Sequence, residues 1–304
     1  MRPRGLPSSR TIQYEILLQN IESLLNDLEV KNIEDNEAET LICQGIEGAY
    51  SHIAAMKYGT APIVFKPTFR DVFFEISGQN YGIVPLDNST EGMVNEVYDL
   101  LLECGLYIIK SIDLTVSHVA MANKNANLSD IRYITAHPQA LRQCSKFIEK
   151  NNLVMMNSTN NAIAARSIRD SGRTDICCLG DRSNAERYDL QIITDKVNNS
   201  ATNTTRFIVV ADKLIAPKEG GKVSLVFSMD NRSGTLASVL NIIASYGISL
   251  SKIESRPIAD EKWEYRFYID IDGNIRDKKV MALIYELRLE LPYVKVLGSY
   301  DELR

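Results

Sequence analysis

The sequence predicts an α/β protein in which a larger α/β region is followed by a separate βαββαβ domain of the ferredoxin-like type. Two observations support this prediction. Between about residues 40 and 216, short apolar runs alternate with helical patterns, which is typical of sheets whose strands are buried on both faces. After the polar loop Pro217–Gly221, the pattern of residues 222–304 indicates strand, helix, strand, strand, helix and strand.

The first 39 residues are predicted to form a helical extension and a linker. Apolar residues recur at helical spacing between Tyr14 and Leu28, which indicates an amphipathic helix over about residues 12–30. The acidic stretch from Glu34 to Glu39 is typical of a solvated linker. We expect the helix to cover a neighbouring surface or a dimer seam.

In the second region, most of the candidate strands are continuous apolar runs. They are Gly82–Pro85, Ile131–Ala136, Val154–Met156, Ile176–Leu179 and Phe207–Val210. Helical patterns occur between them, at Met93–Leu102 and at Gln139–Glu149. The alternation indicates that residues 40–216 form one α/β unit.

The third region has the clearest periodicity of the chain. Its expected elements, in order, are strand Val223–Phe227, helix Leu236–Ala244, strand Ile248–Glu254, strand Tyr265–Ile271, helix Val280–Leu287 and strand Val294–Leu297. Gly247 has the position of a helix stop, and Pro292 ends the second helix.

Composition excludes several classes of protein. The 304 residues have a net charge of −5, which argues against a non-specific nucleic-acid binder. The five cysteines show no zinc or disulfide spacing, which indicates a reducing compartment, and the three histidines form no metal-binding motif. No apolar stretch approaches the ~20 residues of a membrane span, and the N-terminus does not resemble a secretory signal. We therefore expect a cytoplasmic protein that does not insert into membranes.

Polar residues cluster at three predicted strand-to-helix corners and at one strand start. The clusters are residues 87–90, residues 135–144, residues 157–161 and residues 203–207. Helix capping explains one polar residue at each corner, whereas an anionic ligand at a helix N-terminus would explain several. His137 alone is more often structural than catalytic. Arg206 suits a carboxylate ligand or a surface ion pair. The clusters predict either well-capped helices or one shared anion site.

Taken together, these segments resemble the prephenate dehydratase family from about Ile42 to Tyr300. The matching motifs are Gly45–Ser51, Val84–Gly92, His137–Cys144 and Asn203–Phe207, which resemble the family's opening glycine-serine motif and its VPxENSxEG, HPQALxQC and NxTRF motifs. The third region resembles an ACT domain, and its Glu254-Ser255-Arg256-Pro257 segment matches the ESRP motif of phenylalanine-sensing examples.

The resemblance implies a two-lobed, periplasmic-binding-protein-like catalytic domain over residues 40–216 and an ACT regulatory domain over residues 222–304. The implied reaction converts prephenate to phenylpyruvate, water and carbon dioxide, without a metal or an organic cofactor. Thr205 is the expected hydrogen-bond or proton donor to the departing hydroxyl, and Asn88 and Gln143 are the other expected catalytic residues. The expected substrate-binding residues are Ser51, Asp87, Ser89, His137, Ser158, Thr159 and Arg206. The helix start after Asn88 is also expected to neutralise substrate charge.

For the ACT domain, the resemblance implies a phenylalanine site between protomers of a homodimer or homotetramer. Its expected residues are Asn231, Gly234, Thr235, Leu236, Glu254, Ser255, Arg256 and Pro257. The sequence departs from the family pattern at two of the quoted positions. Asp87 replaces a glutamate, which shortens its reach, and Thr235 replaces an alanine, which affects the expected phenylalanine affinity.

Two other functions fit parts of the same pattern. Arogenate dehydratase would perform the same chemistry on the amino-acid form of the substrate, and the sequence pattern does not separate it from prephenate dehydratase. A solute-binding or amino-acid-sensing protein without catalysis is disfavoured by the intact Thr205-Arg206-Phe207 signature. The N-terminal helix is reminiscent of the first helix of chorismate mutase, but about 40 residues cannot form that three-helix bundle, so no mutase activity is expected.

Overall fold

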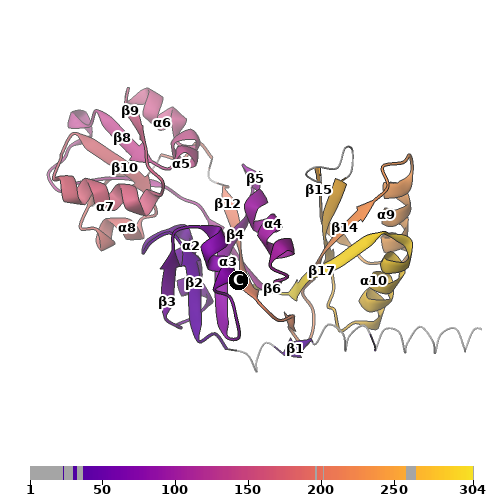
Figure 1. Ribbon diagram of the computed structural model, residues 1–304. Coiled ribbons are helices and arrows are strands. Elements are labelled where there is room, and N and C mark those ends of the chain that lie inside the picture. Colours follow the sequence, from indigo (N-terminus) through magenta and orange to yellow (C-terminus); the bar gives the residue numbers. More distant parts are fainter. Residues whose placement is uncertain are drawn as a thin grey trace, which may run out of the picture.

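The computed structural model describes residues 23, 30–32, 37–195, 197–200, 202–257 and 265–303. The helix expected over residues 12–30 lies almost entirely outside these residues. Figure 1 shows two α/β lobes and a C-terminal unit, with the first lobe between the other two. No helix in the described part of the chain is long and apolar enough to cross a membrane.

The first lobe is built on strands β2 (Thr40–Gln44), β3 (Ile63–Lys66), β4 (Asn80–Asn88), β6 (Tyr107–Thr115) and β12 (Thr204–Ala211), which lie in the order β6-β12-β4-β2-β3. Helices α2 (Tyr50–Tyr58), α3 (Phe69–Phe74) and α4 (Asn95–Glu103) pack around this sheet, and the short strand β5 (Gly92–Met93) pairs with β4. Strand β12, which is last in sequence, lies between β4 and β6 and is antiparallel to both. It therefore brings residues 204–211 into the middle of the sheet.

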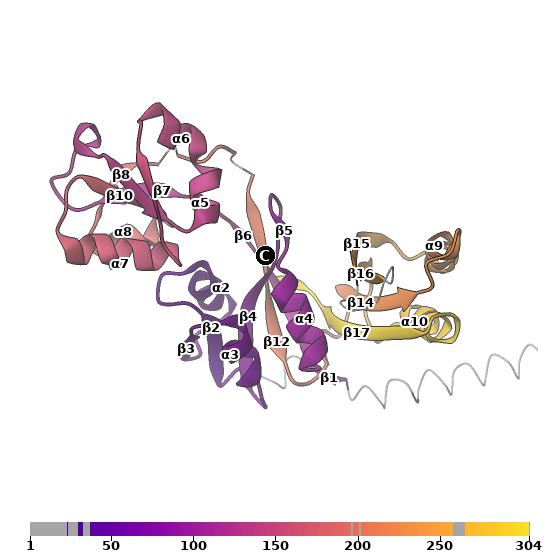
Figure 2. The ribbon, with the colours of Figure 1, turned by 45° about the horizontal axis from the view of Figure 1, so that its top comes forward.

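The second lobe contains strands β7 (Val119–Ala122), β8 (Tyr133–Ala136), β9 (Val154–Asn157), β10 (Ile176–Gly180) and β11 (Gln191–Thr194), in the order β11-β7-β10-β8-β9. Its helices are α5 (Pro138–Gln143), α6 (Ser145–Lys150), α7 (Asn161–Ser171) and α8 (Ser183–Arg187), with a 3₁₀ turn η2 at Leu128–Asp130. The chain enters this lobe after β6 and returns to the first lobe at β12. Figure 2 shows these two crossings between the lobes.

The helix expected at Gln139–Glu149 is interrupted at Cys144. Asn199, on the crossing back to the first lobe, supplies hydrogen bonds at the break: its backbone N–H donates to Gln143 O at 2.7 Å and its side chain donates to Arg142 O at 3.0 Å. Its Oδ1 accepts from the backbone N–H of Lys146 at 3.1 Å. A distant residue thus replaces intrahelical bonds, which explains why the helical period of the sequence did not reveal the break.

The C-terminal unit has the predicted βαββαβ order. Its elements are β14 (Lys222–Met229), α9 (Thr235–Ser245), β15 (Leu250–Pro257), β16 (Tyr265–Asp272), α10 (Lys278–Glu290) and β17 (Tyr293–Tyr300). The antiparallel strands lie in the order β15-β16-β14-β17, and buried residues of both helices join one apolar core with β14 and β16. Two short parallel strands, β1 (Lys31–Asn32) and β13 (Ile215–Ala216), pair beside this unit.

The sheet of the C-terminal unit continues into the sheet of the first lobe. Gly298 of β17 pairs in parallel with Ile108 of β6, and β18 (Glu302–Leu303) pairs further along β6. The approach at Gly298 is close, because a Cβ atom there would lie 2.2 Å from the carbonyl oxygen of Ile108. The C-terminal end of the chain therefore lies against the first lobe (Figure 1).

Replacing Gly298 by alanine should weaken this junction. The added methyl group must displace backbone and not only a flexible side chain, and overpacking of this kind costs about 1–3 kcal/mol. We expect Gly298→Ala to lower the midpoint of thermal or denaturant unfolding. Gly59→Ala is the control, because Gly59 is extended and a Cβ atom there meets nothing within 4 Å. Equal midpoints for both variants would show that the junction adds nothing to stability.

Candidate active site

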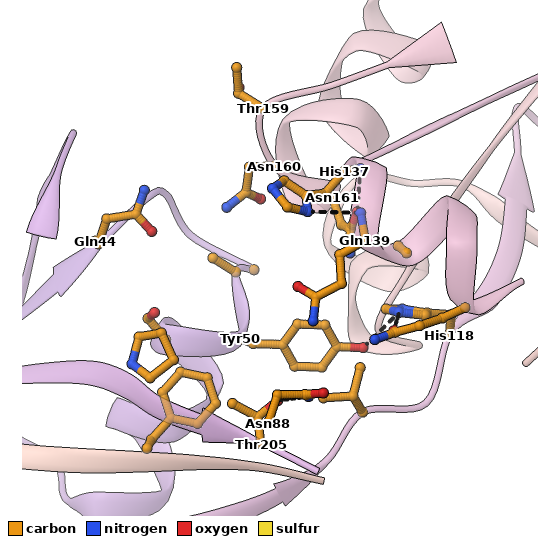
Figure 3. Close-up of a pocket in the computed structure, with 18 of the residues that line it drawn as sticks. Gln44, Tyr50, Asn88, His118, His137, Gln139, Thr159, Asn160, Asn161 and Thr205 are labelled. Atoms are coloured by element: carbon orange, nitrogen blue, oxygen red, sulfur yellow. Dashed lines mark hydrogen bonds between the residues drawn. The ribbon is translucent and has the colours of Figure 1, made fainter. Parts of the chain in front are cut away.

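A cavity of about 310 Å³ lies between the two lobes (Figure 3). The first lobe contributes the beginning of α2, the end of β4 and the beginning of β12, and the second lobe contributes α5 and the segment that leads into α7. Among the described residues that line it, none is aspartate, glutamate, lysine or arginine. Any charge on a ligand must therefore be met here by neutral donors and by the ends of helices.

Asn88 and Thr205 face each other across the β4–β12 pair at the floor of the cavity. Asn88 Nδ2 donates to Thr205 Oγ1 at 2.8 Å and to Asn203 Oδ1 at 2.9 Å. Its Oδ1 accepts from Thr90 Oγ1 at 2.6 Å and from two backbone N–H groups, which fixes the amide. Because Thr205 Oγ1 accepts from Asn88, the hydroxyl proton of Thr205 remains available to another acceptor.

Gln143 comes to the cavity from the end of α5 and reaches a buried histidine that the sequence analysis did not select. His118 lies 3.2 Å from Gln143 through Nε2 and 3.2 Å from the hydroxyl of Tyr50 through Nδ1. All three side chains line the cavity. Tyr50 belongs to the recognised Gly45–Ser51 motif, whereas His118 was considered only as a metal ligand, so neither had been given a role.

Burial decides the protonation state of these groups. Desolvation lowers the pKa of His118, although its hydrogen bond to Gln143 acts in the opposite direction. Desolvation also raises the pKa of the Tyr50 hydroxyl well above its ordinary value. The imidazole is therefore neutral and the phenol protonated at neutral pH.

His137, Thr159 and Ser51, which were predicted to bind the substrate, also line the cavity. His137 caps α5, since its Nδ1 accepts from the backbone N–H of Gln139 at 3.3 Å, and desolvation lowers its pKa. Ser158 was also predicted to bind the substrate, and this stays a prediction. Its hydroxyl donates to Asn160 O at 3.0 Å within the loop, and Ser158 is not among the lining residues.

Three other expected substrate ligands are placed elsewhere. Asp87, Ser89 and Arg206 line a second cavity of about 440 Å³ on the side of the C-terminal unit. The physical reason is strand geometry: neighbouring side chains on a strand point to opposite faces, so Asp87 and Arg206 face away from Asn88 and Thr205. None of these three residues is among the described residues that line the interlobe cavity, and their predicted contact with the substrate stays a prediction.

The charged side chains of Asp87 and Arg206 instead contact the C-terminal unit, each through its own partner. Lys252 of β15 donates from Nζ to both carboxylate oxygens of Asp87 at 2.7 Å, and Tyr98 donates to the same carboxylate at 3.0 Å. Arg206 donates to Asp270 of β16 at 3.3 Å. These contacts attach the rear face of the β4–β12 pair to the neighbouring unit.

The helix that was expected to start directly after Asn88 begins further along the chain. The Asn88 side chain organises a turn that leads into β5, and α4 begins only at Asn95. Other helices take its place, because α2 and α7 both begin at the interlobe cavity, next to Ala49 and Asn160. The Asn160 side chain caps the N–H of Ala162 in α7, and the other first-turn N–H groups and the positive dipole ends of both helices suit a ligand with carboxylate groups.

The residues expected to bind phenylalanine form two segments at one end of the C-terminal sheet. Met229 precedes the segment Asn231–Leu236, Pro257 ends the segment Glu254–Pro257, and both Met229 and Pro257 pair with Tyr265 of β16. Arg256 reaches the first lobe, where its guanidinium donates to Asp99 Oδ1 at 2.8 Å and to Asp99 Oδ2 at 3.1 Å.

Two protein-family models match this chain. The prephenate dehydratase family model matches residues 41–214, and the ACT domain model matches residues 223–288. A bifunctional chorismate mutase/prephenate dehydratase of Neisseria gonorrhoeae is 32% identical over 267 residues, which cover 86% of this chain and 74% of that protein.

Solved structures share the fold. A prephenate dehydratase from Arthrobacter aurescens in complex with L-Phe is 25% identical, covers 86% of this chain and 89% of its own, and has a TM-score of 0.78. GqqA, described as a novel type of quorum quenching acylase, is 26% identical with a TM-score of 0.77, and the match covers 86% of this chain and 98% of GqqA. From the family match over more than half of its length, this chain belongs to the prephenate dehydratase family and has a C-terminal ACT domain.

Proposed function

We propose that the interlobe cavity converts prephenate to phenylpyruvate, with loss of water and carbon dioxide. The observation that carries this proposal is the hydrogen-bonded pair of Thr205 and Asn88 at the floor of a cavity formed by the family-matched residues 41–214. In this reaction, the bond from the ring to its carboxylate breaks and its electrons aromatise the ring. The ring hydroxyl leaves and needs one proton to become water.

Thr205 is the proposed donor to that leaving hydroxyl. Its Oγ1 accepts from Asn88, so its own O–H can point to the substrate. An alkyl hydroxyl is a weak acid, so Thr205 acts as one member of a relay and as an oriented dipole. General acid help of this kind is worth about 10²- to 10⁴-fold, and preorganised dipoles and orientation supply much of the rest.

The substrate carboxylates are proposed to lie at the beginnings of α2 and α7, with Gln143 and Thr159 as further neutral donors. This arrangement favours prephenate over arogenate. Arogenate carries an ammonium group that needs an anionic partner, and no carboxylate occurs among the described lining residues. The reaction is proposed to use no metal and no organic cofactor.

Regulation is proposed to use phenylalanine bound at the segments Asn231–Leu236 and Glu254–Pro257, between the ACT domains of a homodimer or homotetramer. Support for coupling comes from two contacts of β15 with the first lobe. Lys252 holds Asp87, and Arg256 holds Asp99 of α4. A ligand that displaces β15 would change both contacts and so shift the catalytic lobes between open and closed populations.

Three further points remain proposals. The division of the chain into an extension (1–39), a catalytic domain (40–216) and a regulatory domain (222–304) is supported by β2 beginning at Thr40 and β14 at Lys222. A cytoplasmic location is supported by five free cysteines. Edge strand β15, where Ile253 is 39% exposed, supports pairing with a second copy.

The direct test of the proposed function is incubation with prephenate at neutral pH, followed by alkaline ultraviolet detection of phenylpyruvate. Arogenate, with detection of phenylalanine, is assayed in parallel. We expect turnover of prephenate and a higher kcat/KM for prephenate than for arogenate. Turnover of neither substrate would refute the proposed function, and a preference for arogenate would refute the charge argument.

Replacing Thr205 by alanine should lower kcat by about 10²- to 10⁴-fold, because it removes the donor to the leaving group. Thr205→Ser is the matched control, since it keeps the hydroxyl and should retain most of the turnover. Steady-state kinetics and thermal unfolding are measured for both variants. If Thr205→Ala turned over prephenate as fast as Thr205→Ser, the role of the hydroxyl would be wrong.

Replacing Lys252 by methionine should reduce the inhibition by phenylalanine, because the side chain keeps its length but no longer binds Asp87. Allosteric coupling typically changes an affinity by about 5- to 150-fold, and we expect most of that factor to be lost. Calorimetry measures phenylalanine binding, and kinetics measure the coupling. Lys124→Met, which removes an exposed ion pair with Asp189, is the control. Unchanged inhibition in Lys252→Met would exclude this route.

A further inference from the structure

His118 is the most buried of the titratable side chains at the interlobe cavity, with 2% of its surface exposed. It lies on the crossing between β6 and β7, directly before the first residue of the second lobe. Its backbone N–H donates to Asn198 Oδ1 at 3.2 Å, on the crossing that leads back from that lobe. The ring is thereby anchored where both connections between the lobes meet.

The imidazole joins one side chain from each lobe. The hydroxyl of Tyr50, on α2 of the first lobe, lies 3.2 Å from Nδ1, and Oε1 of Gln143, on α5 of the second lobe, lies 3.2 Å from Nε2. The rings of Tyr50 and His118 meet edge to face, with centroids 5.8 Å apart and an interplanar angle of 69° (Figure 3). The position of Gln143 therefore depends on a group that also contacts the opposite lobe.

The side-chain oxygen of Gln143 fixes the direction of its hydrogen bond with His118. A carbonyl oxygen only accepts, so Nε2 of His118 must bear the proton. A neutral imidazole has one N–H, so Nδ1 is an acceptor. The O–H of Tyr50 lies 3.2 Å from Nδ1 and 3.3 Å from the backbone carbonyl oxygen of Ser117, and these two acceptors share its proton. Burial of His118 lowers its pKa and keeps it neutral, which preserves this tautomer.

The hydrogen bond from His118 also determines the direction of the Nε2 group of Gln143. With Oε1 bound to His118, the Nε2 group points away from the imidazole and lies 3.5 Å from Thr90 Oγ1, while Gln143 itself lines the interlobe cavity. That hydroxyl donates to Oδ1 of Asn88 at 2.6 Å, and Asn88 holds Thr205. A rotated amide would present a carbonyl oxygen to an anionic substrate, and the attractive contact would become repulsive.

We propose that His118 is a positioning residue that orients the side-chain amide of Gln143, so that its N–H groups face the anionic substrate. The inference rests on the proposed dehydratase function and deepens it. His118 does not itself donate a proton to the substrate in this scheme. Its effect on the reaction passes through Gln143, and Tyr50 selects the tautomer that makes this possible.

Two substitutions of His118 separate positioning from packing. In His118→Gln the amide nitrogen reaches the place of Nε2 and can still donate to Gln143, whereas in His118→Asn the amide reaches only the place of Nδ1 beside Tyr50. Both variants leave a polar group in the same buried space. We expect His118→Asn to lower kcat/KM by about 10- to 100-fold, the range of one hydrogen bond to a charged group, and His118→Gln to retain most of it.

A double-mutant cycle with Gln143→Ala shows whether His118 acts through Gln143. If it does, adding His118→Asn to Gln143→Ala lowers kcat/KM no further. Independent, multiplicative losses would overturn the proposal, as would equal activities of His118→Asn and His118→Gln. Thermal unfolding of all variants identifies any loss that comes from the fold alone.

A readout without substrate keeps this inference separate from the proposed function. The ¹⁵N shifts of the imidazole, assigned by comparison with His118→Gln, report the tautomer in the free protein. We expect the neutral form with hydrogen on Nε2 at pH 7, and a mixture of tautomers in Tyr50→Phe. A tautomer with hydrogen on Nδ1 in the unmodified protein would overturn the proposal even if prephenate were turned over. The expected tautomer together with no turnover of prephenate would refute only the dehydratase function, because the orientation of Gln143 would still stand.

Discussion

The pairing of β4 with β12 is the constraint on which the rest of the structure depends. The two strands are far apart in sequence and meet with Asn88 opposite Thr205 and Asp87 opposite Arg206. Since side chains alternate along a strand, one face of this pair presents neutral hydrogen-bonding groups to the interlobe cavity and the other presents charges to the C-terminal unit. A shift of the register by one residue would exchange the two faces and place a carboxylate at the cavity floor.

This separation of charge suits the chemistry proposed for each side. An anionic substrate is held best by dipoles that are fixed before it arrives, because such dipoles need no reorganisation as charge moves from the carboxylate into the ring. Buried charges inside the cavity would need partners of their own. The structure places those partners outside it: Lys252 holds Asp87 and Asp270 holds Arg206.

The sequence indicated which strand-to-helix connections lie at the cavity, but not which face of a strand each side chain occupies. Strand-to-helix corners at Asn88, His137 and Thr159 were found because polar residues follow apolar runs, and all three residues line the cavity. Arg206 was predicted to bind the substrate because a guanidinium suits carboxylates, but the two-residue period of the strand puts its side chain on the face opposite to Thr205, at the second cavity. His118 and Tyr50 were missed because their contacts join residues 68 and 25 positions apart, which no local pattern reveals.

The same alternation gives a physical route between the two domains. Asp87 and Asn88 are consecutive residues of β4, and both are held in the same hydrogen-bonded pairing with β12, so a displacement of one is passed to the other. A displacement of Lys252, two residues before Glu254 on β15, would act on Asp87 and through it on the amide that holds Thr205. Coupling by this route requires only a small shift of one strand. The displacement can pass through the sheet because a closely packed protein interior has low compressibility and transmits strain.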